Sequence, residues 1–115
     1  MLILVVSDDE HLREEATFAF PSDVEVVLAK DSKDAWRFLE ERRPDVVVVA
    51  LRSGNAGGFN LLRDMSQREN LRDVPSLMLL ERDQDRWLCK QAGATACRTA
   101  PIEAGDLAAE TLSLV

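Results

Sequence analysis

The stretch PDVVVVALRSGNAGGF, residues 44–59, decides the fold of this chain. Its four consecutive valines, residues 46–49, follow a proline and an aspartate and lead into a glycine-rich loop. An uninterrupted β-branched run is typical of a central parallel strand that is buried on both faces. Open α/β sheets bind their ligands just beyond the carboxyl ends of such strands. Here that position holds Ala50, Leu51 and Arg52, none of which is a nucleophile, a general base or a usual metal ligand.

Around this strand, apolar segments alternate with segments of helical periodicity along the whole chain. The first helix shows the pattern clearly, because Leu12, Ala16 and Phe20 fall on one face. Five strands alternating with five helices predict βαβ units and one parallel sheet covered on both faces, an α/β fold. The strands are expected at residues 2–6, 24–29, 46–49, 76–80 and 94–99, and the helices at about 10–20, 32–43, 59–67, 84–92 and 101–115.

The ends of the predicted helices carry local signals. Asp31 or Ser32 is expected to cap the second helix, and Asp83 the fourth. Gly93 suits the C′ position after the fourth helix. Arg42 completes the inward stripe of the second helix, where its polar head is expected to snorkel towards water.

Composition argues against several classes of function. With 115 residues, the chain is expected to form a single domain, residues 1–115, with a core of its own. The net charge of −7, from 21 acidic and 14 basic residues, argues against direct binding to nucleic acid. The opening apolar run is too short for a signal peptide or a membrane span, so we expect a cytoplasmic protein with no membrane association.

The two cysteines are too few for a disulfide framework and lack the spacing of metal ligands. We therefore predict that Cys89 and Cys97 are small apolar residues, buried or half-buried, in a reducing compartment.

Five segments carry a resemblance to a known family. They are ILVVSDDEHLRE (3–14), AKDSKDAWRFLEERRPDVVVVAL (29–51), GGFNLLRDM (57–65), VPSLMLL (74–80) and QAGATACRTAPI (91–102). From end to end, the chain resembles the receiver domain of bacterial two-component response regulators. The resemblance implies the family's flavodoxin-like (βα)5 fold, a doubly wound sheet of five parallel strands in the order 2-1-3-4-5.

Receivers of this family accept a phosphoryl group from a histidine kinase on an aspartate, with the help of Mg²⁺. In this chain the phosphoaccepting position is Ala50, and the metal-binding acidic pair is Ser7 and Asp8. The switch hydroxyl after the fourth strand, the lysine after the fifth strand and the aromatic switch residue correspond to Leu80, Ala100 and Cys97. Of the five active-site side chains that the family uses, this chain therefore retains one, Asp8.

These substitutions remove the family chemistry. An alanine methyl group cannot act as the nucleophile that accepts a phosphoryl group. Mg²⁺ prefers octahedral oxygen ligands with one or two carboxylates, so Asp8 would give a weak site at most. We expect no phosphorylation by the family mechanism, no catalytic residue, no cofactor and no resident metal.

The acidic run after the first strand has a structural interpretation. Asp8, Asp9 and Glu10 are expected to cap the first helix and to face water. A sharper hypothesis places the guanidinium of Arg52 in the vacated metal position, paired with Asp8. His11 is interpreted as a solvated residue. Asp8 and Glu10 also match the spacing of a phosphohydrolase motif, but no lysine stands at the end of the fourth or fifth strand.

The preferred interpretation is a non-enzymatic signalling module. It would bind a protein partner or a second copy of itself through the fourth helix, fifth strand and fifth helix, the surface that the resemblance implies. Arg86 and Trp87 are the candidate anchors there, because interface hot spots favour arginine and tryptophan. Tryptophans such as Trp87 and Trp36 are more often packed in the core than functional, so core packing is the role that an interface role must displace. The module would be locked in one state or biased by another ligand.

Two other interpretations stay open. The chain could be a small-molecule sensor or a residual phosphate-handling domain that uses the acidic edge at Asp8 and Asp9. A flavin site is disfavoured, because the acidic loop lacks the Gly, Ser and Thr of a phosphate cradle. The chain could also be the N-terminal part of a longer regulator.

Overall fold

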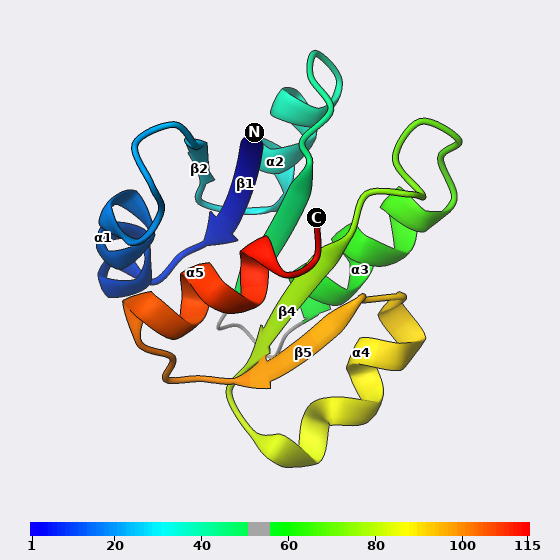
Figure 1. The fold of residues 1–115 in the computed structure, drawn as a ribbon. Helices are drawn as coiled ribbons and strands as arrows, with labels where there is room; N and C mark the ends of the chain where they lie inside the picture. The colour runs from blue at the N-terminus through cyan, green and yellow to red at the C-terminus, as the bar shows by residue number, and fades with distance from the viewer. Residues whose placement is uncertain (51–55) are drawn as a thin grey trace.

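Five parallel strands alternate with helices in the computed structural model, which describes residues 1–50 and 56–115 (Figure 1). The strands are β1 (Leu2–Ser7), β2 (Glu25–Ala29), β3 (Val46–Ala50), β4 (Ser76–Leu80) and β5 (Ala96–Thr99). The helices are α1 (Glu10–Ala19), α2 (Ser32–Leu39), α3 (Ala56–Ser66), α4 (Arg86–Ala92) and α5 (Ala104–Leu112), with a 3₁₀ turn, η1 (Asp83–Asp85), before α4. The strand order is β2-β1-β3-β4-β5, so the predicted α/β fold and the order implied by the resemblance are confirmed.

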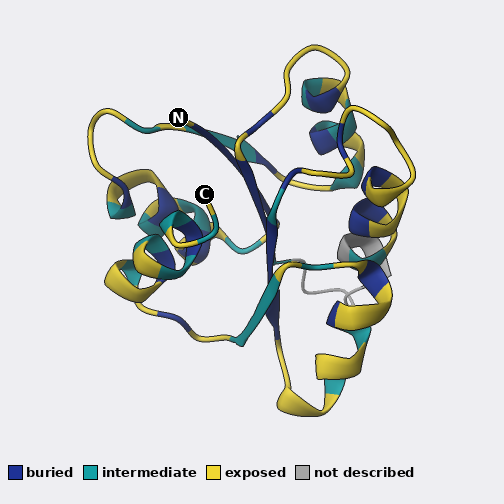
Figure 2. Ribbon diagram, turned by 45° about the vertical axis from the view of Figure 1, so that its right-hand side comes forward, coloured by how far each residue is buried: buried dark blue, intermediate teal, exposed yellow. Residues whose placement is uncertain are grey.

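Helices cover both faces of the sheet, which lies edge-on between them in Figure 2. α1 and α5 pack on one face, and α2, α3 and α4 pack on the other. Because successive strand residues point to opposite faces, the valine run of β3 contributes to both cores. Val46 and Val48 pack with the α1 and α5 side, whereas Val47 and Val49 pack with α2, α3 and α4. All four valines are at most 1% exposed, as expected for a central parallel strand.

The two edge strands are less buried than the centre. Every residue of β5 is half-buried, and β2 has one fully buried residue, Ala29. By contrast, all six residues of β1 and all five of β4 are buried. The outer position of β5 therefore leaves it accessible from the side, next to α4 and α5 (Figure 1).

Some of the predicted caps at the helix ends are confirmed and one is wrong. Asp31 caps α2, because its carboxylate accepts a hydrogen bond from the backbone N–H of Asp34 at 2.8 Å. Gly93 ends α4 with φ at 82°, the left-handed conformation that glycine adopts without a steric cost. The prediction that Asp83 caps the fourth helix is wrong. Asp83 opens η1 instead, and α4 begins after Asp85 without a side-chain cap.

Two element boundaries also differ from the prediction. α3 begins at Ala56, before the predicted start at Phe59. α5 begins at Ala104, after Pro101 and Ile102, because the backbone of its N-cap residue, Glu103, is still extended. Ile102 is buried in the core that includes Leu107. The peptide bond between Ala100 and Pro101 is cis.

Arg42 does not belong to the buried face of α2. It lies beyond the end of the helix, where its guanidinium donates two hydrogen bonds to the carboxylate of Glu25, at 2.9 and 3.1 Å. The hydrogen bonds from Arg42 lower the pKa of Glu25 below its ordinary value. The predicted inward stripe therefore ends at Leu39, since the chain leaves the helix before Arg42 can face the core.

No helix in residues 1–50 and 56–115 is both long and apolar enough to cross a bilayer.

Candidate functional site

The carboxyl ends of the central strands bring the predicted site residues together. The register of β1 and β3 places Ser7 directly opposite Ala50, and that of β4 and β5 places Leu80 opposite Thr99. The backbone N–H of Ala100 then donates to the carbonyl of Leu80 at 2.7 Å. Parallel strands end at the same edge, which is why residues far apart in sequence meet here.

Ser7 connects the ends of β1 and β3. Ser7 is fully buried, and its hydroxyl donates a hydrogen bond to the carbonyl of Ala50 at 2.9 Å. The same oxygen accepts a hydrogen bond from the backbone N–H of Asp9 at 3.1 Å. Arg13, in α1, donates to the carbonyl of Ser7 at 3.1 Å. The serine hydroxyl thus uses its donor and one acceptor position within the protein.

The acidic residues after β1 are arranged as a helix start. Asp9 is the N-cap of α1, and its carboxylate accepts a hydrogen bond from the backbone N–H of His11 at 3.0 Å. Glu10 and Asp8 are exposed at the surface. His11 is also exposed, with Nε2 at 3.0 Å from the carboxylate of Glu15. The predicted capping role holds for Asp9, and His11 is solvated, as expected.

The other side chains at this edge are apolar. Leu80 is fully buried and packs in the core below α2, α3 and α4, whereas Ala100 is exposed. Among the residues that the structure describes, no three His, Cys, Asp or Glu side chains are grouped to hold a metal ion. The hypothesis that Arg52 pairs with Asp8 falls outside those residues.

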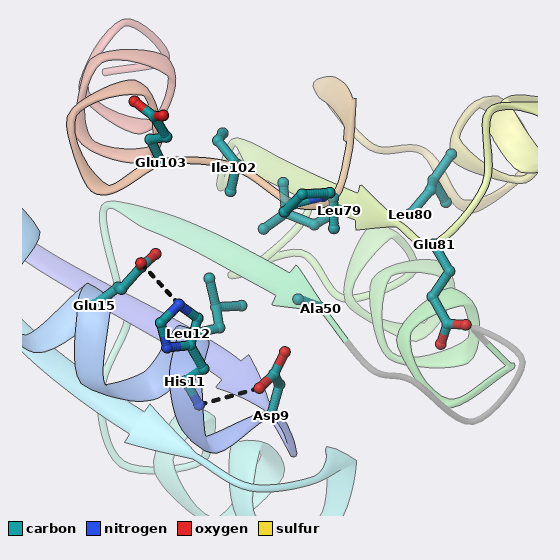
Figure 3. A pocket seen from close by; sticks show the side chains of 12 residues that line it. Asp9, His11, Leu12, Glu15, Ala50, Leu79, Leu80, Glu81, Ile102 and Glu103 are labelled. Carbon is teal, nitrogen blue, oxygen red and sulfur yellow. Dashed lines mark hydrogen bonds and ion pairs between the residues drawn. The ribbon is translucent and has the colours of Figure 1, made fainter.

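A pocket of about 640 Å³ opens between the start of α1 and the segment before α5 (Figure 3). Leu12, Ala50 and Ile102 contribute apolar surface to it. Four carboxylates also line it, those of Asp9, Glu15, Glu81 and Glu103. Two of them are already engaged, since Asp9 caps α1 and Glu15 pairs with His11. The pocket is large enough for a small molecule, with an apolar part and several negative charges.

The cysteines differ from the prediction. Cys89, in α4, and Cys97, in β5, form a disulfide bond and are not separate thiols. They are eight positions apart in the sequence, and the turn at Gly93 folds α4 back over β5, so that their Cα atoms are 6.3 Å apart. This separation is within the range that a disulfide spans. The sequence could have predicted this pairing only from a helix, a turn at Gly93 and a strand considered together as one folded unit.

The sequence also gave no sign of the hydrogen bond between Thr99 and Asp83. The Thr99 hydroxyl, at the end of β5, donates to the carboxylate of Asp83 in η1. This bond, together with Arg86 nearby, lowers the pKa of Asp83 below its ordinary value. β5 is also tied to α5, because Arg98 pairs with Glu110 at 2.5 Å.

The two predicted interface residues lie on the exposed side of α4. Trp87 is 61% exposed, whereas Trp36 is half-buried against the core with the guanidinium of Arg68 over its ring at 4.5 Å. Arg86 is exposed and lies 3.6 Å from the carboxylate of Asp83. Core packing therefore accounts for Trp36 but not for Trp87.

Comparisons with known proteins agree on one family. The family model described as the response regulator receiver domain matches residues 3–111. Among curated proteins, the chain is 28% identical over 110 residues to the phosphate regulon transcriptional regulatory protein PhoB of Escherichia coli, covering 93% of this chain and 48% of that protein. It is 30% identical over 118 residues to the virulence transcriptional regulatory protein PhoP of Shigella flexneri, covering 100% of this chain and 52% of that protein. The chain thus spans about half the length of these relatives.

Solved structures share the fold. The chemotaxis response regulator CheY4 of Vibrio cholerae has a TM-score of 0.86 at 23% identity, over 97% of this chain and 95% of that chain. The receiver domain of the sensor histidine kinase PA1611 of Pseudomonas aeruginosa has a TM-score of 0.74 at 26% identity, over 92% of this chain and 89% of that chain. The PA1611 structure has a magnesium ion coordinated in its active site cleft.

The buried bond between Ser7 and Ala50 can be tested by removing the hydroxyl. Ser7→Ala is expected to lower the free energy of unfolding by about 1–2 kcal/mol, because it leaves a partly buried carbonyl and N–H without their partner. The measurement is urea unfolding followed by circular dichroism. Ser66→Ala is the matched control, since its hydroxyl donates to the Arg63 carbonyl on an exposed helix, and should change stability by less than about 0.5 kcal/mol. Equal losses in the two variants would contradict the assignment.

The bond between Thr99 and Asp83 predicts a pH effect. Thr99→Val removes the donor, so the pKa of Asp83 should rise towards its ordinary value, as measured by NMR titration of its side-chain carboxyl carbon. Because the bond favours the charged form, its contribution is present at neutral pH and is lost as the pH falls through the lowered pKa. Thr17→Val, whose hydroxyl bonds to Arg13 in α1, should leave the titration of Asp83 unchanged. An unchanged Asp83 titration in Thr99→Val would refute the contact.

Proposed function

The chain belongs to the response regulator receiver domain family, and on that premise we propose that it signals without accepting a phosphoryl group. One observation carries the proposal. β3 ends in Ala50, the position that the family resemblance assigns to the phosphoaccepting carboxylate, and the carbonyl of Ala50 is bonded to the Ser7 hydroxyl. A methyl group cannot attack phosphorus, so the family reaction has no nucleophile at this position.

The neighbouring side chains support the same proposal. The family's Mg²⁺ does not fit this donor set, because the position of its first acidic ligand is occupied by the buried Ser7, whose hydroxyl is already engaged. Leu80 offers no hydroxyl to sense a phosphoryl group, and Ala100 offers no cation to balance its charge. The chain would then act as a non-enzymatic module whose output is a protein contact.

We place that contact on the surface formed by α4, β5 and α5. Trp87 is the large aromatic residue exposed there, and Arg86 precedes it. Tryptophan and arginine are enriched among the residues that carry most of the binding energy at protein interfaces. The occupant would be a partner protein or a second copy of this chain.

The pocket near Ala50 favours a second candidate, a small-molecule sensor. Its size suits a metabolite, and its acidic lining suits an organic cation with an apolar part. Amide shifts at Leu12, Ala50 and Ile102 on addition of such cations, without Mg²⁺, would favour this candidate over the first.

The proposal is tested by an NMR amide titration with Mg²⁺, followed by Mg²⁺ with beryllofluoride, a phosphoryl mimic. We expect no shifts at Ser7, Asp8 or Ala50 and none at Trp87 and Cys97, because positions 7 and 50 at the strand ends carry no carboxylate to bind the ion. Shifts that begin at the strand ends and spread to Trp87 would show a surviving phosphate switch and would overturn the proposal.

A matched gain-of-function variant controls the sensitivity of this titration. Ser7→Asp combined with Ala50→Asp adds two carboxylates to Asp8 at one sheet edge. Mg²⁺ should then shift the amides around residues 7 and 50, since hard oxygen ligands are restored. If the variant folds and responds while the natural chain stays silent, the silence reflects the missing carboxylates.

The proposed interface predicts a separation between association and stability. Trp87→Ala should weaken self-association about tenfold or more while changing the melting temperature little, because an exposed side chain contributes little to the core. Sedimentation equilibrium and thermal unfolding measure the two effects. Phe18→Ala is the control, because Phe18 is 83% exposed on α1, away from α4. A large drop in melting temperature with unchanged association would place Trp87 in the core.

A further inference from the structure

The disulfide between Cys89 and Cys97 joins the short helix α4 to the edge strand β5. Cys89 is 4% exposed, and Cys97 is half-buried against the same core. Cys97 is also the position at which the family resemblance places the aromatic switch residue. The covalent bond therefore crosses the part of the fold that the proposed function treats as the output surface.

α4 is short and buries little of its own surface. It has seven residues, of which Cys89 and Ala92 are buried, and a helix this short is not stable by itself. α4 packs against α3, and Cys89 and Ala92 lie in the same core as Met78 and Leu80 of β4. The side-chain bonds that join the region of α4 to β5 are the disulfide and the hydrogen bond from Thr99 to Asp83, just before the helix. The disulfide is thus the covalent constraint on the position of α4.

Trp87 reports directly on that position. It stands two residues before Cys89 in the same helix and is 61% exposed. Opening the bond between Cys89 and Cys97 removes the covalent link between β5 and the helix that carries Trp87 and Arg86. Local opening of weakly held segments is a common source of conformational change in regulatory domains.

We propose that Cys89 and Cys97 form a thiol–disulfide switch that sets the position of α4 and the presentation of Trp87. The inference rests on the proposed function, because it assumes that the surface of α4 and β5 is the output. The signal that such a switch would receive is reduction of the disulfide by a dithiol. The switch has no internal competitor, since the chain contains two cysteines in all.

The chemistry balances with one dithiol. A thiolate of the reductant attacks the sulfur of Cys97, the more exposed residue of the pair, and the sulfur–sulfur bond breaks. Cys89 leaves as a thiolate and takes up a proton. The second thiol of the reductant then attacks the mixed disulfide and releases Cys97. Two electrons and two protons pass to the cysteines, and the reductant becomes a disulfide.

The test compares the oxidised and the dithiol-reduced protein under native conditions. Alkylation of free thiols followed by mass spectrometry gives the redox state, and hydrogen exchange measured by NMR reports on the helix. We expect reduction without denaturant, about tenfold faster exchange of the buried amides of α4, and a shift of the Trp87 indole signal. The amides of β1 and the indole signal of Trp36 should change little.

Cys89→Ala combined with Cys97→Ala is the matched variant. It should reproduce the fast exchange and the Trp87 signal of the reduced protein, and it should ignore the reductant. A disulfide that resists the dithiol until the protein unfolds would overturn the inference. So would identical exchange of α4 in the two redox forms, or a double variant that behaves like the oxidised protein.

Failure of this inference can be told apart from failure of the proposed function. The titration with Mg²⁺ and beryllofluoride is run on both redox forms. A response to beryllofluoride in either form overturns the phosphate-independent function. Silence in both forms, with α4 unchanged by reduction, overturns the switch alone.

Discussion

Burial of β1 and β3 on both faces is the constraint on which the rest of the structure depends. Residues 46–49 are almost without solvent contact, and alternate valines face opposite sides. Each face must therefore be covered by apolar helices, which parallel crossover connections provide. The same parallel arrangement aligns the carboxyl ends of the strands, so the position of the candidate site follows from the way in which the core is built.

At that aligned edge, the described side chains make their contacts within the protein. The hydroxyl of Ser7 links β1 to β3, and Leu80 extends the apolar core to the end of β4. The remaining polar character comes from carboxylates around the neighbouring pocket. A buried hydroxyl with its partners satisfied stabilises the junction between the strands and costs little, whereas an unpaired one would be unfavourable.

The edge of the sheet at β5 contrasts with this tightly packed centre. Its residues are half-buried, and side chains join it to its neighbours, Thr99 to Asp83, Arg98 to Glu110 and Cys97 to Cys89. Cys89 also belongs to the core on the side of α2, α3 and α4, so this edge stays connected to the centre. The edge at β5 is therefore held by side-chain links, whereas the centre of the sheet is held by burial on both faces.

The sequence by itself determined the alternation of strands and helices, the central place of residues 46–49, and the identity of the side chains at the strand ends. These follow from local periodicity and from the position of a residue in its strand. The strand order was predicted from the family resemblance alone. Only the tertiary structure decided the pairing of Cys89 with Cys97, the bond of Thr99 to Asp83, and the departure of Arg42 from its helix to Glu25. Each of these depends on how far one segment folds back over another, a distance that no local pattern encodes.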